Sequence, residues 1–151
     1  RYPAVVKPGT VSNDFVMNLD IAPTMLEAAG VAIPKDEQGQ SMLPLLKDKK
    51  AKGREAVYYH YYENGEHAVS PHFGVRTKRY KLVRFYTRVS SWELYDLQKD
   101  PSEMHNLYGQ KGYEKVTEQM KIQLNKSIDQ YDDQDAKRIL EEGKLNPALK
   151  K

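Results

Sequence analysis

The spacing of the apolar residues changes once along the chain, and this change constrains the fold more than any other feature of the sequence. Short runs rich in aromatic and β-branched residues are separated by turn-forming residues, at 56–62, 73–78, 80–86 and 92–97. Such runs predict β-strands, and their close spacing predicts an antiparallel sheet of about four strands. Apolar residues then recur every three or four positions, at Tyr113, Val116, Met120, Leu124, Ile128 and Tyr131. This spacing predicts a long amphipathic helix over one face of the sheet, and therefore an α+β fold.

The first fifty residues follow neither pattern. Residues 4–6 form an apolar, strand-like stretch that ends at a Pro-Gly turn. In "DIAPTMLEAAG", Asp20 is placed to cap a short helix over residues 21–29, and Gly30 is placed to end it in the left-handed conformation. The chain opens without a methionine, so we expect a further part upstream.

These patterns divide the sequence into three predicted regions. Residues 1–50 are expected to form the edge of another domain, and residues 51–131 to form the sheet and its helix. Residues 132–151 are charged and weakly periodic, so they are expected to form a tail that is either a peripheral helix or partly disordered.

Composition excludes several classes of protein chemistry. The chain has no cysteine, which rules out disulfides, thiolate zinc sites and a cysteine nucleophile. No apolar run approaches the roughly 20 residues of a spanning helix, so no membrane partner is expected. The net charge is +3, and Lys and Arg are spread along the sequence rather than clustered. We therefore expect no nucleic-acid partner.

The segment "WELYDLQKDPSEMHNLY", residues 92–108, concentrates four carboxylates beside a histidine. Residues 100–103, "DPSE", have the spacing of a capping box, in which both acids bind backbone amides at the start of a helix. Glu93 and Asp96 fall on opposite faces of the predicted strand, so they cannot share one ion. His105 has no partner at a metal-ligand spacing. We interpret this cluster as architecture rather than as a metal or acid-base site.

The same segment resembles the "ELYDL..DP.E..NL" signature near the end of sulfatases, the formylglycine-dependent sulfuric ester hydrolases of the alkaline phosphatase superfamily. "DIAPTMLEAAGVAIP", "QGQSMLPLL" and "GVRTKRYKLVRFY" resemble further segments of the family in the same order, so the similarity covers residues 1 to about 110. "YYHYYE" followed by "PHFGVRTKRYKLVRFY" is most similar to the N-acetylglucosamine-6-sulfatases and heparan-type glycosaminoglycan sulfatases of gut bacteria.

This resemblance implies that residues 1–50 are the edge of the family's α/β catalytic domain and that the remainder is its C-terminal subdomain. The implied activity is removal of sulfate from a sulfated sugar, with N-acetylglucosamine-6-sulfate as the candidate. The implied partners are the sulfated saccharide and the N-terminal catalytic domain, and the implied location is periplasmic or secreted. The chain contains no C/S-x-P/A-x-R motif. Formylglycine and calcium are therefore expected in an upstream part, and this chain alone is expected to be inactive.

The segment "HYYENGEHAVSPHFG", residues 60–74, and the strand that follows it hold the candidate site residues. The resemblance makes His72 a sugar-contacting candidate, while its position equally fits a histidine that hydrogen-bonds a backbone carbonyl at a strand start. Glu66 and His67 are candidate loop contacts with the sugar. Arg76 is a candidate for an anionic sugar group, although strand arginines more often pair with nearby acids. His60 alternates with tyrosines in a strand and is expected to be a hydrogen-bonded sheet residue.

Two other function classes stay open. The chain also fits the tail of a related superfamily hydrolase, such as a phosphodiesterase or phosphonate hydrolase, and it fits a stand-alone carbohydrate-binding module. The upstream sequence separates the three. A C/S-x-P/A-x-R motif favours the sulfatase, a Thr or unconverted Ser nucleophile favours the related hydrolase, and a start codon just before Arg1 favours the module.

Overall fold

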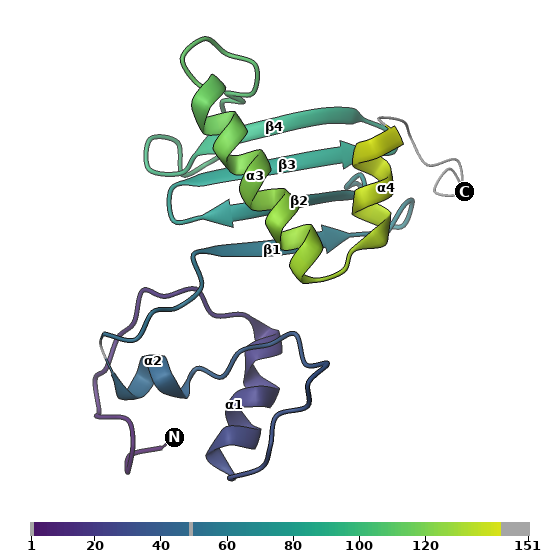
Figure 1. Ribbon diagram of the computed structural model, residues 1–151. Helices are drawn as coiled ribbons and strands as arrows, with labels where there is room; N and C mark the ends of the chain where they lie inside the picture. Colours follow the sequence, from purple (N-terminus) through teal and green to yellow (C-terminus); the bar gives the residue numbers. More distant parts are fainter. Residues whose placement is uncertain (1, 49, 143–151) are drawn as a thin grey trace. The chain divides into compact units, whose positions relative to one another are not determined.

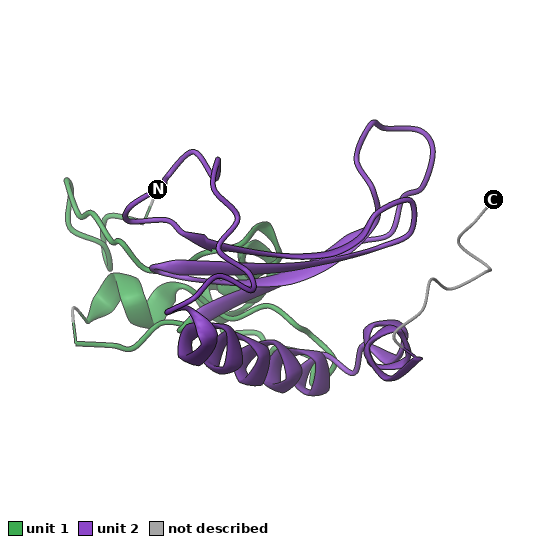
Figure 2. Ribbon diagram, turned by 90° about the horizontal axis from the view of Figure 1, so that it is seen from above, with its two compact units in different colours: residues 1–55 green, residues 56–151 purple. Residues whose placement is uncertain are grey.

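The computed structural model describes residues 2–48 and 50–142 of the chain. The chain divides into two compact units, residues 1–55 and residues 56–151, which Figure 2 draws in green and purple. We call them the N-terminal unit and the sheet unit and describe each by itself.

The sheet unit contains one four-stranded antiparallel sheet in which the strands pair in chain order (Figure 1). Its strands are β1 (Ala56–Tyr61), β2 (His72–Thr77), β3 (Tyr80–Tyr86) and β4 (Ser90–Asp96). Each strand boundary lies within two residues of the boundary expected from the sequence, and the predicted α+β class is confirmed. The alternation of side chains across a pleated strand explains this agreement, because β-branched and aromatic residues fit a half-buried sheet surface.

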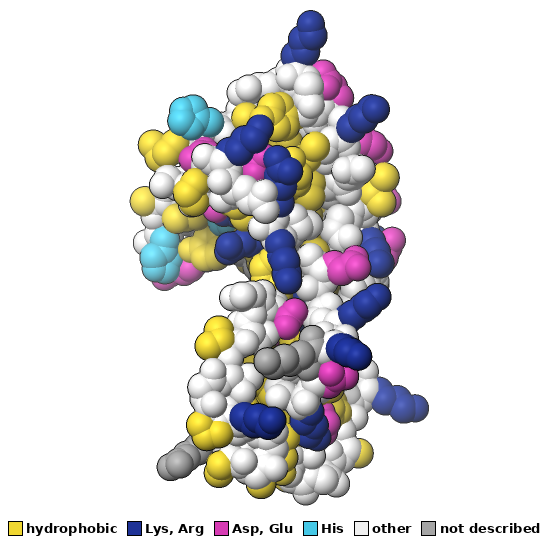
Figure 3. Space-filling view, turned by 90° about the vertical axis from the view of Figure 1, so that its left-hand side faces the viewer, with side chains coloured by type: hydrophobic (Ala, Val, Ile, Leu, Met, Phe, Trp, Pro, Cys, Tyr) yellow, Lys and Arg dark blue, Asp and Glu magenta, His cyan; other side chains and the backbone are white. Residues whose placement is uncertain are grey.

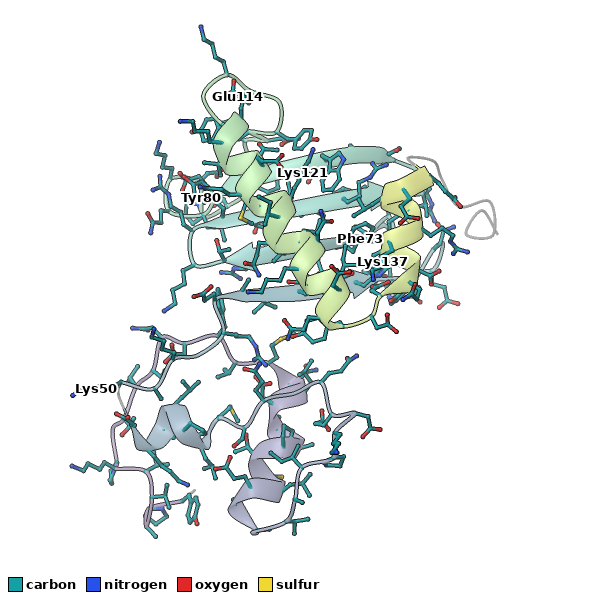
Figure 4. The ribbon with its side chains drawn as sticks, in the orientation of Figure 1. Lys50, Phe73, Tyr80, Glu114, Lys121 and Lys137 are labelled. Atoms are coloured by element: carbon teal, nitrogen blue, oxygen red, sulfur yellow. The ribbon has the colours of Figure 1, made fainter. Side chains whose placement is uncertain are left out.

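Two helices, α3 (Glu114–Gln130) and α4 (Gln134–Glu142), lie on one face of the sheet, as Figure 2 shows in a view from above. Figure 4 shows Phe73 of β2 on this covered side. The apolar stripe of α3 packs against alternate strand residues, which creates a core of Phe73, Val75, Leu82, Tyr86, Leu94, Met120, Leu124 and Ile128. Each large side chain buried there contributes about 1.5 to 3 kcal/mol. The predicted helix and its place over the sheet are confirmed.

Helix α4 agrees with the helical alternative expected for the tail after residue 131, but it is not peripheral. Its Ala136 and Ile139 are 0% and 1% exposed and belong to the same core as the sheet. Ala136, Ile139 and Leu140 have the i, i+3, i+4 spacing of one helix face, but they lie among charged residues, and the expectation for the segment followed its charge. Residues 143–151 of the expected tail lie outside the described residues.

The capping box expected at residues 100–103 does not start a helix. No helix lies between β4 and α3, and Glu103 has a φ of 55°, which a right-handed helix excludes. Asp100 does accept a backbone amide, from His105 at 2.8 Å, while the carboxylate of Glu103 accepts from Lys81 Nζ at 2.6 Å. The segment is therefore architecture, as interpreted, but it is a turn tied to β3 rather than a helix start.

The N-terminal unit contains a 3₁₀ turn (Asn18–Asp20), helix α1 (Ile21–Ala28) and helix α2 (Leu43–Lys47). The helix expected over residues 21–29 is confirmed. It ends as predicted at Gly30, whose φ is 71° and whose amide donates to the carbonyl of Glu27. Residues 4–6 do not form the expected strand. The amides of Val5 and Val6 both bond to the carbonyl of Tyr2, so this stretch is a turn.

Asp20 does not cap α1 as expected, because its carboxylate is buried and committed elsewhere. It accepts hydrogen bonds from the amides of Met17 and Gln40, at 2.7 and 2.9 Å, and from both terminal nitrogens of Arg54. Burial acts to raise the pKa of Asp20, but these hydrogen bonds, led by Arg54, outweigh it and lower the pKa. This clasp joins residues 17, 20, 40 and 54 of the N-terminal unit.

The N-terminal unit has little apolar core. Its buried residues, among those that the structure describes, are Asp20, Pro23 and Leu43. It carries most of the exposed large apolar side chains of the described chain, namely Tyr2, Val11, Val16, Ile21, Met25, Val31 and Ile33.

Candidate functional site

The candidate site lies on the sheet face turned away from α3 and α4, which we call the back face. In β2, Phe73 and Val75 face the helices, so His72 and Gly74 face the other way. The strand register sets Tyr61 of β1 on one side of His72. Phe85 of β3 lies opposite His72 on the other side.

His72 is held in one orientation by its backbone partner and its aromatic neighbours. Its Nδ1 lies 2.8 Å from the carbonyl oxygen of Ser70, so Nδ1 donates, and in the tautomer that this bond selects Nε2 is the acceptor. The ring centroid is 5.0 Å from that of Phe85, 5.5 Å from Tyr61 and 5.7 Å from Tyr59. Nε2 makes no hydrogen bond to the described residues. It is therefore a fixed acceptor at the edge of an aromatic cluster.

A glycine lets Tyr59 approach β2 beside this cluster. A Cβ on Gly74 would lie 2.8 Å from the hydroxyl of Tyr59 and 2.5 Å from the carbonyl oxygen of Leu82. Only a residue without a side chain fits between them. The Tyr59 hydroxyl is buried and has no hydrogen-bond partner among the described residues. Burial raises the pKa of Tyr59, so its hydroxyl keeps the proton.

The loop between β1 and β2 is tied to Tyr61. The carboxylate of Glu63 accepts from the Tyr61 hydroxyl at 3.0 Å and from His67 Nδ1 at 2.8 Å. The side chain of His67 is 65% exposed, and Glu66 is exposed beside it. The structure thus links His67 to His72 through Tyr61, whereas Glu66 extends into solvent.

Arg76 is not part of this group. It lies four residues further along β2 than His72, which corresponds to about 13 Å in an extended strand. Its side chain is exposed and makes no ion pair with the described residues. Arg76 therefore lies near the opposite end of the back face.

Two residues of the site were not among the candidates expected from the sequence. Tyr59 and Tyr61 have the alternation that puts them on one face, which the sequence does reveal. Their contact with His72 depends on the pairing of β1 with β2, and the ten-residue loop between these strands hides that register from sequence reasoning.

Other features of the described chain limit the kind of site. Within residues 2–48 and 50–142, no group of three or more His, Asp or Glu side chains lies close enough together to hold a metal ion. Figure 3 shows Lys and Arg side chains scattered over the face that it draws, with His side chains among apolar and acidic ones on the sheet unit. None of the described helices combines the length and apolar character that a membrane crossing requires.

Comparison with known proteins gives a consistent family. The model of the N-sulphoglucosamine sulphohydrolase C-terminal family matches residues 1–130. An N-acetylglucosamine-6-O-sulfatase of Bacteroides thetaiotaomicron is 43% identical over 89% of this chain and 25% of its own length. A Δ4,5-hexuronate-2-O-sulfatase of the same organism is 33% identical over 73% of this chain and 23% of its own length. The chain thus spans about a quarter of the length of these relatives.

Solved structures agree with this result. The structure of BT4656 in complex with its substrate D-glucosamine-2-N,6-O-disulfate superposes with a TM-score of 0.85 at 43% identity, over 89% of this chain and 28% of that chain. A phosphonate monoester hydrolase of Agrobacterium radiobacter shares the fold, with a TM-score of 0.61 at 24% identity, over 74% of this chain and 24% of that chain. The family match over residues 1–130, together with the matching sheet and helices, identifies the chain as a member of the sulfatase C-terminal family.

Proposed function

We propose that this chain is the C-terminal part of a sulfatase that removes sulfate from a sulfated sugar of the glycosaminoglycan type, with N-acetylglucosamine-6-sulfate as the candidate substrate. The observation that carries the proposal is the 43% identity, over 89% of the chain, to an N-acetylglucosamine-6-O-sulfatase. The substrate of BT4656, a 6-O-sulfated glucosamine, supports the same class of sugar.

The back face supports a role in sugar recognition. A saccharide presents hydroxyl donors together with apolar C–H faces, and it requires oriented acceptors and aromatic surfaces. His72 offers Nε2 as an acceptor, and the rings of Tyr61 and Phe85 flank it. His67 and Glu66 of the loop are proposed as outer contacts, and Arg76 as a contact only for a longer, anionic saccharide.

The described residues do not fit a sulfatase metal site, since no suitable cluster of ligands is present among them. We therefore assign no step to calcium or formylglycine in this chain and propose that both belong to another part of the protein. The role of this chain is to bind and orient the sugar. A periplasmic or secreted location is proposed from the sequence resemblance alone, and fractionation of the producing cells tests it.

The N-terminal unit is proposed to pack against the catalytic domain. A hollow of about 530 Å³ on this unit is lined mainly by apolar residues, namely Tyr2, Val6, Thr24, Met25, Ala28, Leu43 and Leu46. Covering apolar surface of this kind with another part of the protein lowers the free energy, because the surface is removed from water. The small share of each relative that the chain covers supports such a further domain.

The test uses the intact protein with two substrates, a 6-O-sulfated glucosamine saccharide and an artificial aryl sulfate. A buried or part-buried hydrogen bond left unmade costs about 1 to 3 kcal/mol. His72→Ala should therefore lower kcat/KM on the saccharide by roughly 10- to 100-fold, since about 1.4 kcal/mol corresponds to tenfold. The aryl sulfate should lose much less.

Arg138→Ala is a matched control, because Arg138 is an exposed residue of α4, and its partner Asp135 is also exposed. This variant should leave kcat/KM unchanged on both substrates. Equal loss on both substrates after His72→Ala, or no loss on the saccharide with an unchanged melting temperature, would remove His72 from the sugar site.

A phosphonate or phosphodiester hydrolase is the second candidate, and the fold shared with the phosphonate monoester hydrolase supports it. Identity of 24% establishes the fold alone, so the reaction must be measured. The intact protein should hydrolyse the sulfate ester much faster than a phosphonate monoester with the same leaving group. The reverse preference would favour the second candidate. The isolated chain should hydrolyse neither.

A further inference from the structure

The back face depends on a strand that lies at the edge of its sheet. β1 pairs with β2 on one side only, and all six of its residues are half-buried. An edge strand has half the backbone hydrogen bonds of a central one. Tyr59 and Tyr61, which flank His72, are both on β1. Something besides the β1–β2 ladder must hold this strand in place.

Asp133, in the turn between α3 and α4, provides that second attachment. Its Oδ2 lies 2.6 Å from His60 Nδ1 and 2.7 Å from the Tyr58 hydroxyl, so it binds two residues of β1 at once. The Tyr62 hydroxyl, just after β1, lies 3.4 Å from the same oxygen. Oδ1 accepts the amide of Ala136 at 2.9 Å and so caps α4. One carboxylate thus fastens both the end of β1 and the start of α4.

His60 and Asp133 are both buried, and each ring nitrogen of His60 has a complementary partner. The His60 side chain is 4% exposed and that of Asp133 is 8% exposed. His60 Nδ1 donates to Asp133, and the Tyr86 hydroxyl of β3 donates to Nε2 at 2.8 Å. The ring of Tyr62 stacks on His60 at 3.8 Å. Because both ring nitrogens are satisfied, the end of β1 is fixed against β3 as well as against the helices.

Because side chains alternate between the two faces of β1, holding its helix-facing residues also fixes the positions of its residues on the back face. Tyr58 and His60 point toward the helices, and the residues between and after them, Tyr59 and Tyr61, point toward His72. We propose that Asp133 is a positioning residue for the sugar site: by binding Tyr58, His60 and Tyr62 it holds β1 so that Tyr59 and Tyr61 flank His72. This inference rests on the sugar-binding role proposed above.

The test compares Asp133→Asn with Asp135→Asn in the intact protein. Asn has a single acceptor oxygen, so it can either accept the Ala136 amide and cap α4 or accept from Tyr58 and His60, but it cannot do both as the two oxygens of Asp133 do. Asp135 is two residues away, 55% exposed and bonded to Arg138, so its substitution removes a nearby charge without touching β1. Tyr58→Phe is a milder variant that removes one bond to Asp133 and keeps the ring.

Displacement of a recognising group lowers productive binding, so Asp133→Asn should reduce kcat/KM on the sulfated saccharide by about tenfold, mainly through a higher KM. Tyr58→Phe should act in the same direction with a smaller effect. With either variant, kcat/KM on the aryl sulfate should change by less than about twofold. Asp135→Asn should leave kcat/KM unchanged on both substrates. Assays are run well below the lowest melting temperature of the set.

A double-variant cycle tests whether the effect passes through the His72 cluster. In a His72→Ala background, Asp133→Asn should cause little further loss on the saccharide, because the group that it positions is already gone. A full additional tenfold loss, or equal losses on both substrates, would overturn the positioning role and leave Asp133 purely structural. If His72→Ala itself shows no saccharide-specific loss, the sugar site fails and this inference fails with it. If His72→Ala is selective and Asp133→Asn is not, only this inference fails.

Discussion

The two units of the chain are stabilised in opposite ways. The sheet unit buries an apolar cluster contributed by all of its layers, β2, β3, β4, α3 and α4. The N-terminal unit buries few residues, and the most specific interaction in it is the ion pair of Asp20 with Arg54. The fold of the sheet unit is specified mainly by its own apolar pattern. The N-terminal unit holds its backbone through a buried polar clasp and leaves its apolar side chains exposed, as expected for a surface that another domain covers.

The largest expected effect comes from the core of the sheet unit. Leu124 of α3 is 1% exposed, and Leu124→Ala should reduce the free energy of unfolding of this unit by about 2 to 5 kcal/mol, because it leaves a cavity among packed side chains. Urea unfolding followed by the fluorescence of Trp92 measures this change. Leu43→Ala in the N-terminal unit is the matched control and should leave that transition in place. Equal shifts for both variants would mean that the two units share one cooperative transition.

Asp20→Ala should disrupt the N-terminal unit alone. The substitution leaves Arg54 buried without its carboxylate, and breaking a buried ion pair in this way typically costs about 3 to 5 kcal/mol of folding free energy. The measured loss cannot exceed the free energy of unfolding of the N-terminal unit itself. Hydrogen exchange should speed up for the amides of residues 17 and 40, which bond to the Asp20 carboxylate, and stay unchanged in β2 and β3. Faster exchange throughout the sheet would contradict the separation of the two units.

Gly74→Ala should have a smaller effect, confined to the back face. The new methyl group would meet the Leu82 carbonyl and the Tyr59 ring, so β2 and Tyr59 must shift, at a cost of about 1 to 3 kcal/mol. The melting temperature and saccharide kinetics of the intact protein measure it. Gly109→Ala is a useful contrast, since nothing lies near its Cβ position, although its φ of 76° adds local strain. No change after Gly74→Ala would mean that Tyr59 does not lie over β2.

The smallest expected effect is a difference in acid sensitivity. Burial lowers the pKa of His60 from its usual 6.5, against the opposing pull of Asp133. Below pH 6.5 the unfolded chain binds a proton at His60 more readily than the folded sheet unit does. The free energy of unfolding of this unit should therefore begin to fall as the pH drops below 6.5.

The groups around His60 are Asp133, Tyr58, Tyr62, Tyr86 and, acting through their charges, Asp135 and His72. The N-terminal clasp behaves differently, because the lowered pKa of Asp20 keeps its contribution intact until the pH falls below 3.8. Denaturant midpoints between pH 7 and 5 should therefore decrease for the wild type and stay flat for His60→Gln. A parallel decrease in both would assign the effect to other groups.

The sequence predicted what depends on local pattern. The four strands and α3 follow directly from periods of two and 3.6 residues, and Gly30 ends α1 where only a left-handed residue fits. The capping box at residues 100–103 misled, because Glu103 bonds to Lys81 across the sheet rather than to its own backbone. The core position of α4 was missed although Ala136, Ile139 and Leu140 share one helix face, because the charged residues around them led the segment to be interpreted as a tail.

Long-range pairing limited the prediction of the site. His72 was identified through a family resemblance, and its hydrogen bond to Ser70 was one of the two possibilities considered. The aromatic cluster around it depends on register across a long loop, and the Asp133 attachment depends on a contact more than seventy residues distant in sequence. No local signal carries either of these.

We propose that the sheet unit is stable by itself and that the N-terminal unit depends on another part of the protein. Hydrogen exchange of the isolated chain, compared with the same residues in the intact protein, tests it most directly. We predict that residues 2–48 and 50–55 exchange much faster in the isolated chain than in the intact protein, while β2, β3 and α3 are protected alike in both. Equal protection of the two units in the isolated chain, unchanged in the intact protein, would contradict the account.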